Sequence, residues 1–119
     1  MPIRTFRHSL NQPYNSTPEY IANAFNIALS NWADVLICSW NVAPSQTIKD
    51  AIDRVVNCGR DGKGAVVLAA SGNDYPNYPR VDYPARLASV IAVGASDMCN
   101  ERQVMESLAT HRAQKPVWP

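Results

Sequence analysis

Three short runs of consecutive apolar residues constrain the fold of this chain more than any other feature. They read VLICSW at 35–40, AVVLAA at 65–70 and SVIAVGA at 89–95, and each is bounded by loop-forming residues. Runs of this length predict strands that are buried on both faces of a sheet. Helical spacing between the first two runs gives a strand–helix–strand order. That order predicts parallel pairing with right-handed crossovers.

Two amphipathic helices are expected before and after the first run. The earlier one is capped by Ser16 or Thr17, has Pro18 in its first turn, and places apolar residues at i, i+3, i+4 and i+7. The later one follows Ser45 or Thr47. The expected buried stripes are Ile21, Ala24, Phe25, Ala28, Leu29 and Trp32 in the first helix, and Ile48, Ala51, Ile52, Val55 and Val56 in the second.

The remaining segments are expected to be connections. Residues 3–6 suggest a short strand, whereas residues 7–16, 59–64 (GRDGKG) and 71–88 are rich in polar residues, glycine or proline and predict loops and turns. We therefore predict an α/β fold of three layers, with a mainly parallel sheet and flanking helices.

Charge and composition exclude several function classes. The net charge is +1, from 11 basic and 10 acidic residues, and no basic block interleaves with aromatics. This predicts no nucleic-acid or membrane partner. No apolar stretch is long enough for a membrane helix, and the first residues lack the apolar core of a signal peptide. The chain as given is therefore expected to be cytoplasmic.

Cysteine and histidine usage argues against two familiar kinds of site. Cys38, Cys58 and Cys99 contain no C-x-x-C pair, so no zinc site is expected. We expect three reduced cysteines, two of them packed within elements. His8 and His111 are the only histidines, and no G-x-S-x-G motif is present. Both histidines are expected to be solvated.

Asn73 is the polar residue with the most suggestive position. It follows Gly72 just beyond the second apolar run, and ligands of open α/β sheets bind beyond the carboxyl ends of strands. Its amide could stabilise a developing oxyanion, although a loop asparagine that bonds its own backbone is the simpler interpretation. By contrast, GRDGKG follows a helix and opens a strand, which is the reverse of a phosphate-binding loop.

Neighbouring segments, taken together, resemble the subtilisin-like serine peptidases, the subtilase family. They are ADVLICSW, GAVVLAASGND and YPARLASVIAVGASD, in this order, and the resemblance covers about residues 1–102. In that family a strand ending in Ser lines the substrate cleft, and a later strand ends in Ala-Ala-x-Gly-Asn, whose Asn is the oxyanion-hole donor. The resemblance therefore implies that Asn73 is a catalytic residue.

The resemblance also implies substrate-binding residues and partners. Ser39, Trp40 and Asn41 would edge the cleft and bond the backbone of an extended peptide or protein substrate. Ala70, Ser71 and Gly72, with Ala69, would wall the pocket for the residue before the scissile bond. Many members carry Gly where Trp40 or Asn41 stands, which implies an altered cleft. Tyr83–Pro84 matches a cis peptide bond of the family.

The resemblance has departures that bear on activity. The catalytic Asp and His of the family are expected before Met1, and its nucleophilic Ser well after residue 102, so this chain alone is predicted to be inactive. We expect a partial peptidase domain at 1–102 and an atypical tail at 103–119, with two helical turns at 104–112. The missing segments of the domain would then be partners. Calcium is common in the family, but Asp74 and Asp82 are interpreted as loop carboxylates, so no metal site or cofactor is assigned.

Three alternatives of other classes stay open. The chain could be a non-catalytic peptide- or protein-binding module derived from the fold, using its cleft strands without turnover. It could be a nucleotide-binding α/β domain. It could also be an unstable piece whose unpaired strand edges favour aggregation.

Overall fold

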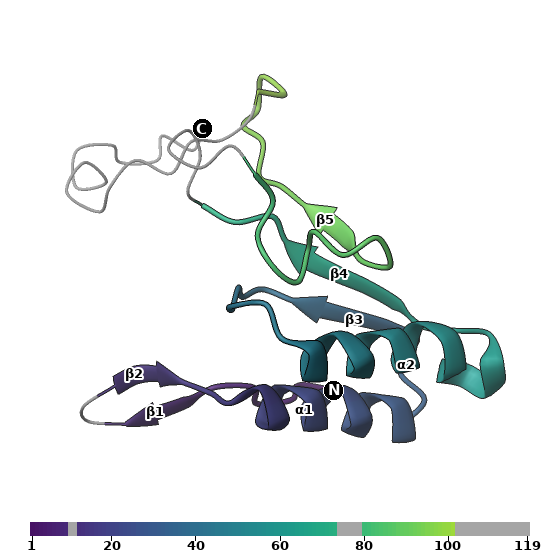
Figure 1. Cartoon of the computed structure of the whole chain (residues 1–119). Helices are drawn as coiled ribbons and strands as arrows, with labels where there is room; N and C mark the ends of the chain where they lie inside the picture. Colours follow the sequence, from purple (N-terminus) through teal and green to yellow (C-terminus); the bar gives the residue numbers. More distant parts are fainter. Residues whose placement is uncertain (10–11, 74–79, 102–119) are drawn as a thin grey trace.

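A central parallel sheet and a separate hairpin organise the chain in a computed structural model that describes residues 1–9, 12–73 and 80–101 (Figure 1). The hairpin pairs β1 and β2 antiparallel, and the sheet has the order β3-β4-β5 with both pairs parallel. This arrangement confirms the predicted α/β class. The elements are β1 (Arg7–Ser9), β2 (Gln12–Asn15), α1 (Pro18–Ser30), β3 (Val35–Cys38), α2 (Gln46–Gly62), β4 (Val66–Ala70) and β5 (Ile91–Val93).

Helix α1 begins and ends where local chemistry dictates. The Oγ1 of Thr17 accepts a hydrogen bond from the Tyr20 N–H at 3.2 Å, so Thr17 is the N-cap. Ile21 and Phe25 are almost completely buried. Trp32 was expected in the same stripe, but it is 60% exposed. The helix ends at Ser30, and Trp32 has a φ of 58°, which turns its side chain away from the core.

Helix α2 supplies the most deeply buried side chains. Ile48, Ile52 and Val55 are each at most 1% exposed, as its apolar stripe predicts. Ser45 occupies the N-cap position, yet its side chain makes no capping hydrogen bond. The predicted GRDGKG turn is confirmed, because Arg60 and Asp61 both take left-handed backbone angles before β4 begins.

Both helices lie on one side of the sheet, which leaves the opposite side open (Figure 1). Cys38, Val67 and Ala69 are buried against the helices, whereas Val35 and Ile37 are 53% and 76% exposed. The prediction that the strands are buried on both faces is therefore wrong for the described residues. We call the other side the outer face; its exposed apolar residues are Val35, Ile37, Val66, Ile91 and Val93.

Several expected boundaries also need correction. Residues 3–6 form no strand, and residues 7–16, expected as a loop, contain the β1–β2 hairpin. Hairpin pairing uses backbone groups, so the polar sequence of this segment gave no strand signal. Of the third apolar run, Ile91–Val93 alone forms a strand. The first run ends as a strand at Cys38, so Ser39 and Trp40 lie past the end of β3. The expected helical turns at 104–112 and the tail at 103–119 lie outside the described residues.

Cysteines differ from the prediction in one respect. Cys38 is buried, whereas Cys58 and Cys99 are exposed, and all three are free thiols. Two cysteines are expected to be packed, and among the three Cys38 alone is buried. Within the described part of the chain, the two helices fall short of the length and apolarity needed to cross a bilayer.

Candidate functional site

The loops that follow β3 and β4 meet at one edge of the sheet. The two strands are adjacent and parallel, pairing Val35 with Val66 through Cys38 with Ala69, so their carboxyl ends coincide. Residues 39–42 leave β3 here, and residues 71–73 leave β4. The predicted site residues Ser39, Trp40, Asn41, Ala70, Ser71, Gly72 and Asn73 therefore occupy this edge, with Asn73 exposed at the end of the described loop.

A third segment, residues 82–84, ties the two loops together. The Asp82 N–H donates to the carbonyl oxygen of Ser71 at 3.0 Å, and the Val42 N–H donates to the carbonyl oxygen of Tyr83 at 3.1 Å. The Ser71 N–H donates to the Val93 carbonyl oxygen at 2.9 Å. The loops after β3 and β4 are thus held in a fixed relation by backbone hydrogen bonds. The Tyr83–Pro84 bond is cis, as the resemblance implies.

The side chain of Asp82 lies between the two loops. Its Oδ2 accepts a hydrogen bond from Asn41 Nδ2 at 3.1 Å. The same oxygen packs so closely against Gly72 that a Cβ there would overlap it, and Gly72 has a φ of +103°. The positive φ is what favours glycine at this position, because the Asp82 side chain could shift to make room for a Cβ. From the sequence, Asp82 is expected to be an ordinary loop carboxylate. Its contacts with Asn41 and Gly72 arise only from tertiary folding.

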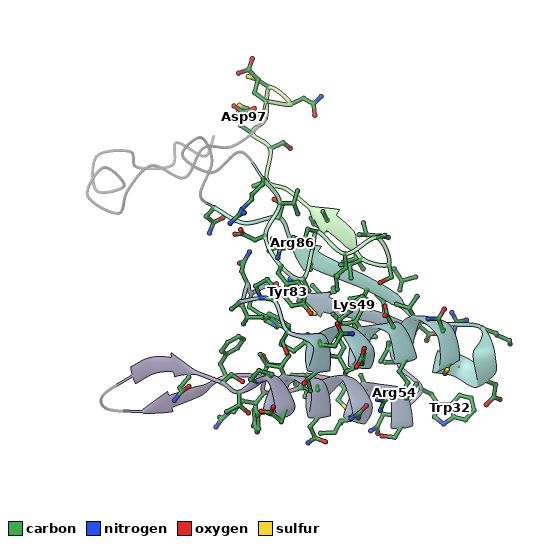
Figure 2. The ribbon with its side chains drawn as sticks, in the orientation of Figure 1. Trp32, Lys49, Arg54, Tyr83, Arg86 and Asp97 are labelled. Carbon is green, nitrogen blue, oxygen red and sulfur yellow. The ribbon has the colours of Figure 1, made fainter. Side chains whose placement is uncertain are left out.

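Tyr83 anchors this segment to the start of α2 (Figure 2). Its hydroxyl donates to the carbonyl oxygen of Ser45 at 2.9 Å, and the Arg86 guanidinium lies 5.9 Å from its ring centroid. Burial raises the pKa of the Tyr83 hydroxyl above its ordinary value. The segment that joins the two loops therefore has a buried attachment.

A charge pair lies beside this anchor on α2. The Nζ of Lys49 is 2.5 Å from Oδ2 of Asp53, and Ser89 Oγ donates to Oδ1 of Asp53 at 3.3 Å. The hydrogen bond with Asp53 raises the pKa of Lys49, and the same bond lowers the pKa of Asp53. Ser89 precedes β5, so this pair links α2 to the end of the connection that carries Asp82.

Trp40 packs inward. Its ring makes edge contacts with Phe25 and Phe6, at centroid distances of 6.4 Å and 5.7 Å, and it lies against the buried core. The resemblance assigned Trp40 to the cleft edge. Its side chain supports the loop, while Ser39 and Asn41 on either side are exposed. The implied role of Trp40 uses its backbone and stays a prediction.

A groove of about 680 Å³ runs along the free edge of β3. Met1, Ile3 and Thr5, at alternate positions of the N-terminal segment, form part of its lining, and Ser39 and Trp40 also contribute to it. Among the described residues, no strand pairs with β3 on this side. A strand edge that is left unpaired can accept an extended chain.

Metal ligands and histidines give no further site in the described residues. No group of three His, Cys, Asp or Glu side chains there is arranged to hold a metal ion. His8 lies on β1, and His111 lies outside the described residues. The chemistry available at the described edge is therefore that of amide and hydroxyl donors, backbone groups and the Asp82 carboxylate.

Comparison with known proteins identifies the class. The model of the Subtilase family matches residues 5–118, so the chain belongs to this family. The matched region includes the stretch after residue 102 that was expected to be atypical. The boundary at that residue stays a prediction.

Particular relatives agree with this assignment. The chain is 34% identical over 97 residues to a "Calcium-dependent protease" of Trichormus variabilis, a match over 67% of this chain and 14% of that protein. It is 34% identical over 94 residues to "Subtilisin NAT" of Bacillus subtilis subsp. natto, over 76% of this chain and 23% of that protein. The chain thus spans less than a quarter of these relatives.

A solved structure supports the fold. The prenylagaramide maturation protease PagA superimposes with a TM-score of 0.63 at 23% identity, covering 77% of this chain and 32% of that chain. This likeness concerns the fold, because the identity is low. The α/β arrangement with a parallel sheet is therefore subtilisin-like.

Proposed function

We propose that this chain supplies the oxyanion-hole donor and two cleft strands for peptide-bond hydrolysis by a subtilisin-like serine endopeptidase. Asn73 is the donor, and Ser39 and Asn41 edge the cleft. The observation that carries the proposal is the convergence of the loops after β3 and β4 at one edge of the sheet, joined through Asp82 and Tyr83. Membership of the Subtilase family supports the proposal that this edge is part of a peptidase cleft.

The proposed role of Asn73 follows from electrostatics. An amide N–H stabilises the tetrahedral oxyanion best when it is already in place before charge develops. The hydrogen bonds of Ser71 to Asp82 and Val93 hold the base of the Asn73 loop on two sides. This anchoring reduces the reorganisation that the donor would need during reaction.

We propose further that the triad comes from segments outside this chain and that the chain alone does not hydrolyse peptides. The groove along the free edge of β3 is where such a segment, or an extended peptide, would pair. Addition of a strand would satisfy backbone groups that β3 leaves unpaired.

The experiment is a chimera in which residues 1–102 replace the matching part of Subtilisin NAT. Hydrolysis of a chromogenic peptide is measured for the chimera and its Asn73→Ala variant. We expect Asn73→Ala to lower kcat by about 10²–10³ with little change in KM, the usual effect of losing one oxyanion donor. The matched control is Asn57→Ala on the exposed face of α2, which should leave kcat unchanged.

Two results would contradict the proposal. An active chimera that is indifferent to Asn73→Ala would remove Asn73 from catalysis. Hydrolysis by the unmodified 119-residue chain, lost on Asn73→Ala, would show that the chain carries its own nucleophile.

A second candidate function is peptide binding without turnover. The unpaired edge of β3 beside the groove favours it, because strand addition needs no catalytic group. Saturable binding of an extended peptide, with no hydrolysis in either the chain or the chimera, would support this function over the first.

A further inference from the structure

We propose that Tyr83 is a positioning residue: its side chain fixes the loop 39–45 for substrate binding, whereas the loop that carries Asn73 is held without it. This inference rests on the proposed function and deepens it. It predicts that substrate affinity and turnover depend on different contacts at this edge of the sheet.

Tyr83 contacts the loop 39–45 at two separate points. Its carbonyl oxygen accepts a hydrogen bond from the Val42 N–H at 3.1 Å, and its hydroxyl donates to the carbonyl oxygen of Ser45 at 2.9 Å. Val42 lies in the middle of the loop, and Ser45 is the last residue before α2 begins at Gln46. One residue therefore fixes the second half of the loop relative to the connection that leads to β5.

The hydroxyl of Tyr83 acts where the cap of α2 is incomplete. Ser45 occupies the N-cap position, and its side chain makes no capping hydrogen bond. Its carbonyl oxygen accepts from the Lys49 N–H at 3.1 Å as well as from the Tyr83 hydroxyl, using both of its lone pairs. The junction between the loop and the helix is thus tied to a partner outside both.

Burial separates the role of the hydroxyl from that of the ring. Tyr83 is 5% exposed and packs within the hydrophobic core. Burial raises the pKa of its hydroxyl, so the group stays protonated and remains a donor at neutral pH. A phenylalanine ring would fill the same space. What the hydroxyl adds is therefore the hydrogen bond to Ser45.

The loop that carries Asn73 has a support that does not involve Tyr83. The Ser71 N–H donates to the carbonyl oxygen of Val93 at 2.9 Å, which fastens the start of this loop to β5. The Ser71 carbonyl oxygen accepts from the Asp82 N–H at 3.0 Å. Loss of the Tyr83 hydroxyl removes neither bond. We therefore expect this loss to loosen the proposed peptide-binding residues of the loop 39–45 and to leave the proposed oxyanion donor in place.

Tyr83→Phe is the test variant, because it removes the hydroxyl and keeps the ring that packs in the core. Ser89→Ala is the matched control. It also removes one hydroxyl donor between the same connection and α2, namely the bond from Ser89 Oγ to Oδ1 of Asp53. That bond does not involve the loop 39–45.

Amide hydrogen exchange of the whole 119-residue chain, followed by NMR, tests the positioning itself. In Tyr83→Phe, exchange of the Val42 N–H should quicken by about threefold to tenfold, the effect of losing one hydrogen bond, while exchange of the Ser71 N–H stays unchanged. Ser89→Ala should change neither amide. Unchanged exchange at Val42, or equal acceleration at Val42 and Ser71, would overturn the inference.

Kinetics of the chimera with Subtilisin NAT test the consequence for the proposed function. We expect Tyr83→Phe to raise KM by about threefold to tenfold and to keep kcat within about twofold, because binding weakens equally in the ground state and the transition state. A purely structural defect would lower kcat by reducing the folded fraction and leave KM unchanged, and this result would overturn the inference.

The two experiments keep the inference separate from the function beneath it. A chimera that is inactive even with Tyr83 intact would overturn the proposed function and the link to substrate binding. The exchange rates of Val42 and Ser71 would still decide whether Tyr83 positions the loop 39–45. An active chimera in which Tyr83→Phe leaves KM unchanged would overturn the inference and leave the proposed function intact.

Discussion

Single residues take roles here that depend on their burial. Asn73 follows the end of β4, and Asp82 lies in the connection that leads to β5. Asp82 makes side-chain contacts with two loops. Cys38 lies at the end of β3, where the helices cover it, and burial raises the pKa of its thiol from 9.0 to about 11. Cys58 and Cys99 lack this cover.

The Cys38 thiol should make stability depend on alkaline pH. Because its pKa is higher in the folded than in the unfolded state, its contribution is complete below pH 9 and lost as pH rises toward 11. The loss corresponds to about 2–3 kcal/mol. We expect the free energy of unfolding in urea to fall over this range. Cys38→Ala should be less stable at pH 8 but show a shallower decline, although Tyr83 and Lys49 still contribute. An identical decline in both proteins would contradict the assignment.

The reactivity of the three thiols should follow their exposure. With a thiol reagent at pH 8, Cys58 and Cys99 should react quickly, and Cys38 only upon unfolding. Fast modification of all three cysteines in the folded chain would show that β3 is not covered as described.

Elements depend on the turns between them, and the turn from α2 to β4 is the most constrained. Gly62 and Gly64 have φ values of +80° and +78°. A Cβ at Gly64 would overlap the carbonyl oxygen of Val56, whereas a Cβ at Gly62 meets nothing within 4 Å. The two glycines therefore differ only in steric surroundings.

Gly64→Ala and Gly62→Ala form a matched pair. The left-handed conformation alone costs about 1–2 kcal/mol for alanine, and this is the full expectation for Gly62→Ala. Gly64→Ala should cost clearly more, about 3 kcal/mol or above, because β4 must shift relative to α2. Thermal or urea unfolding measures both. Equal destabilisation would show that Val56 moves away freely.

At the scale of the whole molecule, the outer face is the dominant feature. Register places Ile37, Leu68 and Ile91 side by side on the sheet, with Val35 next to Val66 and Ala70 next to Val93. Residues paired in this way share one side of a sheet. Both helices lie on the opposite side (Figure 1), so this apolar surface is open to water and to other molecules.

The outer face should cause association that a charge can suppress. Ile37 is 76% exposed, so Ile37→Lys should leave folding intact and lower the self-association measured by sedimentation velocity at rising concentration. Ile27→Lys is the control, since Ile27 is 38% exposed on α1 and lies outside this face. If both variants associate like the parent chain, the outer face does not drive the process.

Local sequence determined much of this protein. The stripe of α2 and the Thr17 cap depend on neighbours within a few residues, and the apolar runs gave three strands in the right order. Strand order with intervening helices also implied parallel pairing. These features could be predicted because local spacing and capping chemistry are their physical cause.

Tertiary structure alone decided the rest. An apolar run cannot show whether helices cover one face or two, since its composition suits burial in either case, and here the outer face is open. The β1–β2 hairpin forms through backbone pairing that its polar side chains do not encode. Asp82 contacts Asn41, 41 residues away in the chain, because backbone hydrogen bonds hold the two loops together. Contacts of that separation follow from the packed fold and from no local pattern.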